Sequence, residues 1–90
     1  MSEVALKKIL NTVLIDKFPG IKEVKVREED NEAYYPSRKE YNIYIGMTYS
    51  EMEKVDVEEV RSEARNISRY VVDFPREVVQ KVVFFDPYFN

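Results

Sequence analysis

The clearest pattern in the chain is one strand followed by one helix. From Tyr41 to Tyr49 every second residue is apolar or aromatic, which is typical of a strand with one buried face. A few residues later, apolar side chains recur at spacings of three and four, which indicates a helix with one apolar stripe. We therefore expect this helix to cover the strand. The strand face comprises Tyr41, Ile43, Ile45, Met47 and Tyr49, and the helix stripe comprises Val57, Val60, Ala64, Ile67 and Val71.

The N-terminal part of the chain predicts a second helix and a second strand. Residues 2–17 place one apolar face on a helix, with Ser2 as its N-cap, and Phe18-Pro19-Gly20 ends it. Residues 21–28 then alternate as a weaker strand, which suits the edge of a sheet because lysine and arginine on it discourage unwanted pairing. The helix face comprises Leu6, Ile9, Leu10, Val13 and Leu14.

The connections leave some alternatives open. Residues 29–40 are too many for a tight hairpin turn, so either the strands extend into them or they form a surface loop. Two capping-box patterns follow, at Ser50 and at Asp56. We favour Asp56 as the start of the long helix, since the apolar stripe begins at Val57, and assign a short preliminary turn to Ser50.

The C-terminal part is ambiguous between helix and strand. Asp73-Phe74-Pro75 breaks the long helix, and the valines of residues 76–85 fit either a helical face or a β-strand. We favour a strand, because a two-stranded sheet under two helices would be marginally stable. Residues 86–90 are predicted to form an extended tail with two aromatic side chains.

These elements predict one α+β domain over residues 1–90, built as a two-layer sandwich. The order is α-β-β-α-β, with two helices on one face of a small, mainly antiparallel sheet. This order resembles part of a ferredoxin-like fold that lacks its first strand, and it is also similar to small KH-type RNA-binding domains. A KH domain implies a Gly-x-x-Gly loop that clamps nucleic acid. The two glycines here, Gly20 and Gly46, do not have that spacing.

Composition narrows the class of function. The net charge of −3 argues against indiscriminate binding to nucleic acid or acidic membranes. The chain has no cysteine, which excludes disulfides and thiolate metal sites and suits a reducing cytosol, so we expect a cytoplasmic protein. Lys7 and Lys8 interrupt the N-terminal apolar run, and no span reaches transmembrane length, so we expect neither a signal peptide nor a membrane partner.

The absence of histidine argues against an enzyme. It removes the usual general base at neutral pH, the commonest metal ligand and every histidine-based triad. The chain also has no phosphate-binding glycine loop and no nucleophile elbow. An acidic run lacks the ligand spacing of an EF-hand and is interpreted as a solvated turn; it comprises Glu28, Glu29, Asp30 and Glu32. We therefore predict no catalytic residue, no cofactor and no metal.

Two cationic groups are candidate binding residues. Arg61, Arg65 and Arg69 are spaced i, i+4, i+8 on the long helix, which indicates either a ridge for phosphates or carboxylates or a solvated face paired with acids such as Glu58. We favour the solvated face. The second group alternates aromatic and basic residues, and it suits base stacking, a protein hot spot, or a loop anchored by its own tyrosines. It comprises Tyr34, Tyr35, Arg38 and Lys39 and continues into Tyr41.

The aromatic content supports the leading hypothesis. Seven tyrosines and five phenylalanines are many for a two-layer domain whose second sheet face has no helix to cover it. Tyr44 should lie on that face, and Phe84, Phe85, Tyr88 and Phe89 crowd the C-terminus. We predict a non-enzymatic interaction protein that binds itself as a homodimer, or another protein, through this face or an edge strand. The alternative is an RNA- or single-stranded-DNA-binding module that uses the arginines and the tyrosine-rich loop.

Overall fold

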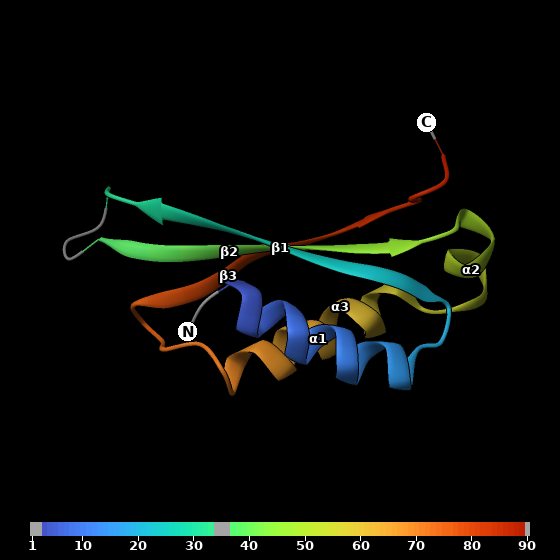
Figure 1. Cartoon of the computed structure of the whole chain (residues 1–90), viewed down its shortest axis with the longest axis horizontal. Helices are drawn as coiled ribbons and strands as arrows, with labels where there is room; N and C mark the ends of the chain where they lie inside the picture. Colours follow the sequence, from blue (N-terminus) through green and yellow to red (C-terminus); the bar gives the residue numbers. More distant parts are fainter. Residues whose placement is uncertain (1–2, 34–36, 90) are drawn as a thin grey trace.

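A three-stranded mixed sheet forms one layer of the computed structural model, which describes residues 3–33 and 37–89. The central strand β2 (Arg38–Met47) pairs antiparallel with β1 (Ile21–Asn31) and parallel with β3 (Glu77–Phe85). The helices α1 (Glu3–Lys17) and α3 (Val57–Arg69) both lie below one face of the sheet, and no helix of the described part of the chain covers the other face (Figure 1). The predicted α+β class and the order α-β-β-α-β are confirmed.

The first two strands form a long hairpin. Their pairing runs from Ile21 opposite Met47 to Asn31 opposite Arg38, so the strands extend into the segment that the sequence left open. β1 is one edge of the sheet, as its basic residues led us to expect, and β3 is the other. Ser2, Tyr34 and Tyr35 lie outside the described residues.

The helix starts follow capping chemistry. Asp56 is the N-cap of α3, where its Oδ1 accepts a hydrogen bond of 3.0 Å from the Glu58 N–H. The short preliminary helix α2 (Tyr49–Lys54) also exists, but its N-cap is Thr48 rather than Ser50. Tyr49 is therefore the first residue of a helix, and it is 52% exposed, so its predicted place on the buried strand face is wrong.

The core lies between the sheet and the two long helices. Val60 and Ala64 of α3 are buried in one cluster with Ile43 and Ile45 of β2, and Ile67 packs against this cluster, as predicted. In α1 the fully buried residues form the single row Leu6, Leu10 and Leu14, while Val13 is exposed, so the predicted apolar face of α1 is too wide. No helix of the described residues is long and apolar enough to span a membrane.

A bulge in β3 decides which of its side chains reach the core. Tyr41 pairs with Val79 but Asn42 pairs with Lys81, so Gln80 is an extra residue. The side-chain alternation therefore changes at this point, and Val79, Val82 and Phe84 all contact the core. The valines do not share a face at simple alternate spacing, which explains why the sequence of this strand resembles a helix.

Candidate interaction surfaces

The open face of the sheet has an apolar end, where β2 and β3 finish. Tyr44 lies beside Val83, and Phe85 lies beside Gly46, all on the side away from the helices. A Cβ at position 46 would lie 2.8 Å from Cγ of Glu23 and 3.2 Å from Cζ of Phe85, so a larger residue here would displace these side chains. Lys25 of β1 places its Nζ 5.4 Å from the centre of the Phe85 ring. The half-buried residues Tyr44, Val83 and Phe85 are called the aromatic strip below.

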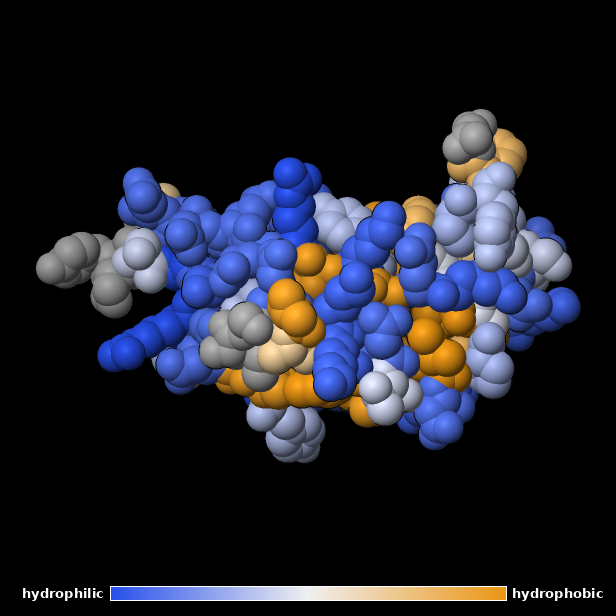
Figure 2. Space-filling model, viewed as in Figure 1, coloured by the Kyte–Doolittle hydropathy of each residue, from blue (hydrophilic) through white to orange (hydrophobic). Residues whose placement is uncertain are grey.

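More aromatic side chains are exposed at the same end of the sheet. The rings of Tyr49 and Phe89 meet edge to face, with their centres 5.3 Å apart, and Asp86 accepts a hydrogen bond of 3.0 Å from the Tyr49 N–H. Figure 1 shows the C-terminal tail leaving β3 on the helix-free side, and Figure 2 shows that hydrophobic atoms of this tail project beyond the body of the molecule. Tyr49, Tyr88 and Phe89, each more than half exposed, are called the tail cluster.

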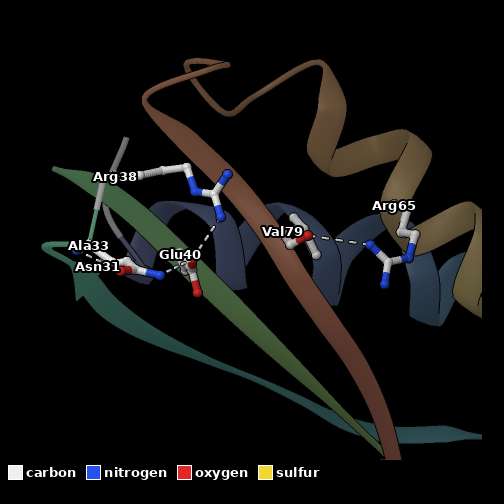
Figure 3. Close-up of polar contacts among 6 residues, drawn as sticks. All are labelled: Asn31, Ala33, Arg38, Glu40, Arg65 and Val79. Atoms are coloured by element: carbon white, nitrogen blue, oxygen red, sulfur yellow. Dashed lines mark hydrogen bonds and ion pairs between the residues drawn. The ribbon is translucent and has the colours of Figure 1, made fainter. Parts of the chain in front are cut away.

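The other end of the open face is charged and internally paired. Glu40 is buried, and its Oε1 accepts hydrogen bonds from Asn31 at 2.8 Å and from Arg38 at 3.0 Å (Figure 3). These two hydrogen bonds lower the pKa of Glu40. Between the two ends, Asn42 is only 2% exposed, and its side-chain oxygen has no donor among the described residues.

The two basic residues of the predicted loop, Arg38 and Lys39, do not lie on one surface. Lys39 lies on the side of β2 opposite to Arg38, because neighbouring residues of a strand face opposite ways. Its Nζ is 2.8 Å from a carboxylate oxygen of Glu28, and this hydrogen bond and charge raise the pKa of Lys39. Arg38 and Lys39 are thus each paired with a carboxylate, on different faces.

Two of the three candidate arginines bind the outer edge of β3. The Nε of Arg61 donates to the carbonyl of Val82 at 3.2 Å. Arg65 donates to the carbonyls of Val79 at 3.3 Å (Figure 3) and Gln80 at 3.4 Å. Arg61 also pairs with Glu58, the acid named from the sequence, and lies over the ring of Phe84. Arg69, one turn further on, is exposed.

The outer edge of β1 is bound in a similar way by α1. Asn11 donates from its Nδ2 to the carbonyl of Val24 at 3.3 Å, and Glu3 accepts from the N–H of Glu28 at 2.9 Å. Each edge strand therefore has backbone groups occupied by helix side chains. Unpaired edges invite strands from other molecules, so we expect these contacts to protect the sheet from edge-to-edge association.

Removing the arginine contacts should expose the edge of β3. We expect the double variant Arg61→Ala, Arg65→Ala to aggregate at a lower temperature than the unmodified chain, because three carbonyls lose their donors. Light scattering during a thermal ramp measures this onset. Arg69→Ala is the control, since it makes the same change on the same helix away from these bonds. Equal onset temperatures for all three proteins would contradict the protective role.

A hydrogen-bonded pair of ionisable side chains, Tyr41 and Glu77, lies inside the molecule. The hydroxyl of Tyr41 donates to Glu77 Oε2 at 3.0 Å, and Glu77 Oε1 accepts from the Asp73 N–H at 2.8 Å. Burial raises the pKa of Tyr41, and the Glu77 carboxylate raises it further. Burial alone would raise the pKa of Glu77 too, but the hydrogen bonds from Asp73 and Tyr41 prevail and lower it. This pair was not recognised from the sequence, because it depends on where β3 aligns with β2.

Comparisons with known proteins add no family to this description. No protein-family model, no curated protein and no solved structure matches the chain. Within residues 3–33 and 37–89, no three metal-ligating side chains come together as a group that could hold an ion. The open face, the paired charges and the bound edges are therefore the basis for a functional proposal.

Proposed function

We propose that this chain is a non-enzymatic interaction protein that forms a homodimer through the apolar end of its open sheet face. The observation that carries the proposal is the aromatic strip of Tyr44, Val83 and Phe85, which no helix covers and which the tail cluster continues. An apolar patch of adjoining side chains on an uncovered face is typical of an interaction site.

The helix side chains that bind the edges of β1 and β3 favour the open sheet face, rather than an edge strand, as the dimer contact. A strand from a second copy would have to displace Asn11 and Glu3 from β1, or Arg61 and Arg65 from β3. Two copies related by a two-fold axis can instead bury the same strip against each other, and the assembly then closes. The strip and tail cluster are only part of one small face, so we expect the contact to be smaller than a standard interface of about 800 Å² per partner. We therefore expect a dissociation constant in the micromolar range.

The remaining parts of the proposal rest on composition. The proposed lack of enzymatic activity is supported by the absence of histidine, the usual catalytic base. The proposed cytoplasmic location is supported by the absence of cysteine, which suits a reducing compartment. The nucleic-acid alternative has weaker support. Arg61 and Arg65 direct donors to the β3 backbone, while Arg38 and Lys39 are paired with acids on opposite faces.

The dimer is tested by charging the face. We expect Tyr44→Glu to weaken dimerisation at least about tenfold, because a two-fold contact would bring two buried carboxylates together. Phe89→Glu changes an exposed tail residue, so it should weaken the dimer without affecting folding. Sedimentation equilibrium from low to high micromolar loading measures the effect.

Tyr70→Glu is the matched control for the dimer. It makes the same chemical change at a tyrosine that is 92% exposed and lies at the end of α3, away from the open face. It should leave dimerisation unchanged. A mass of 10.7 kDa, that of the monomer, for the unmodified chain at every loading would refute the homodimer. Retention of the chain on an oligonucleotide pool at low salt would instead favour the nucleic-acid alternative.

A further inference from the structure

A second surface feature lies at the other end of β3, where the chain enters the strand from α3. It is an open groove of about 310 Å³. Val72, Val78 and Val79 are half-buried along it, and Phe74 is 73% exposed beside them. Among residues 3–33 and 37–89, the charged residues that line it are Arg65 and Arg69. The groove is thus apolar with a cationic margin.

The two arginines differ in how they are held. Arg65 is fixed by its hydrogen bonds to the carbonyls of Val79 and Gln80. The side chain of Arg69 makes no hydrogen bond or ion pair with any residue of the described ranges. In a chain of net charge −3, the groove therefore has an uncompensated positive charge beside an apolar surface.

We infer that this groove binds a peptide segment of a partner protein in which a large apolar side chain stands next to Asp or Glu. The apolar side chain would contact Val72, Phe74 and Val78, and the carboxylate would pair with Arg69, whose planar guanidinium suits two-point recognition of carboxylates. The volume is at the lower limit of small-molecule pockets, which span about 300–1,000 Å³. Because the groove is also open to solvent, it suits one side chain of a peptide better than an enclosed ligand.

This site is independent of the proposed dimer. Val78 and Val79 lie near the start of β3, whereas Val83 and Phe85 of the aromatic strip lie near its end. Failure of one proposal therefore leaves the other intact.

The test is a titration followed by NMR of the backbone amides. The probe is the acetylated, amidated dipeptide phenylalanyl-glutamate, with phenylalanyl-glutamine and alanyl-glutamate as its neutral and ring-free counterparts. We expect millimolar binding of the probe, with shifts confined to residues 69–79, and weaker binding of both counterparts. Arg69→Ala should weaken probe binding about threefold to tenfold, as loss of a charge-assisted hydrogen bond would. Arg27→Ala, an exposed arginine on β1, should have no effect.

Three outcomes would overturn the inference. If phenylalanyl-glutamine bound as tightly as phenylalanyl-glutamate, the carboxylate would not contribute to binding. If Arg69→Ala bound the probe as tightly as the unmodified chain, Arg69 would not contribute to binding. The amide spectrum of the variant verifies in the same experiment that it is folded. Shifts of residues 69–79 that follow protein concentration without any peptide would assign the groove to a second copy of the chain.

Discussion

Replacing Ile45 by alanine is expected to lower the free energy of unfolding by about 2–5 kcal/mol. Ile45 is fully buried at the centre of the sheet, and it pairs with Val24 on β1 and with Phe84 on β3. The substitution removes buried methyl groups and leaves a cavity that three strands and two helices cannot all collapse to fill. Unfolding in denaturant measures the loss.

Val13→Ala is the control for this prediction. Val13 is also aliphatic but is 41% exposed on α1, so its replacement should change stability by no more than about 0.5 kcal/mol. If Ile45→Ala were equally mild, the central strand would not face the helices, and the two-layer arrangement would be wrong.

Tyr41→Phe is expected to lower the free energy of unfolding by about 1–3 kcal/mol at neutral pH. The substitution keeps the ring but removes the hydroxyl that donates to Glu77 at 3.0 Å, so a buried carboxylate loses one of its donors. Tyr44→Phe makes the same change at a half-buried residue of the open face, and it should change the free energy of unfolding by no more than about 0.5 kcal/mol.

The effect of Tyr41→Phe should depend on pH. The pKa of Glu77 is lowered in the folded chain, so its contribution to stability is present above the ordinary glutamate pKa of about 4.3 and is lost as the pH falls below it. The unmodified chain and Tyr41→Phe should therefore converge in stability in acid, because a protonated Glu77 depends less on the phenol. A difference that stays constant from pH 7 to pH 3 would show that the hydroxyl acts independently of the Glu77 charge.

The central strand and the long helix could be predicted because the apolar residues of each recur at one regular spacing. Ile43 and Ile45 alternate without interruption, and Val60 and Ala64 follow a helical spacing, so local sequence and tertiary packing agree. β3 is different, since the bulge at Gln80 changes the side-chain alternation within the strand. No local pattern marks that bulge, because it is set by the alignment of β3 with β2.

Some residues of the candidate surfaces could also be placed from the sequence, and others could not. Tyr44 could be placed on the uncovered face from alternation alone. The hydrogen-bond partners of Arg61 and Arg65 could not be predicted from the sequence, because they are backbone carbonyls 14 to 21 residues further along the chain. The groove was missed for a related reason: Arg69, Phe74 and Val78 belong to a helix, a turn and a strand, and no single period connects them.

The side chains that bind the sheet edges also limit which substitutions the surface can accept. Asn11 and Arg65 are polar residues at the protein surface, where many side chains are usually interchangeable. Here each is matched to a backbone group of a neighbouring strand. Lysine at position 65 would keep the charge, but its single ammonium lacks the fork that reaches two adjacent carbonyls. We therefore expect fewer substitutions to be tolerated at Asn11 and Arg65 than their surface positions suggest, because each side chain must match a backbone group of the sheet.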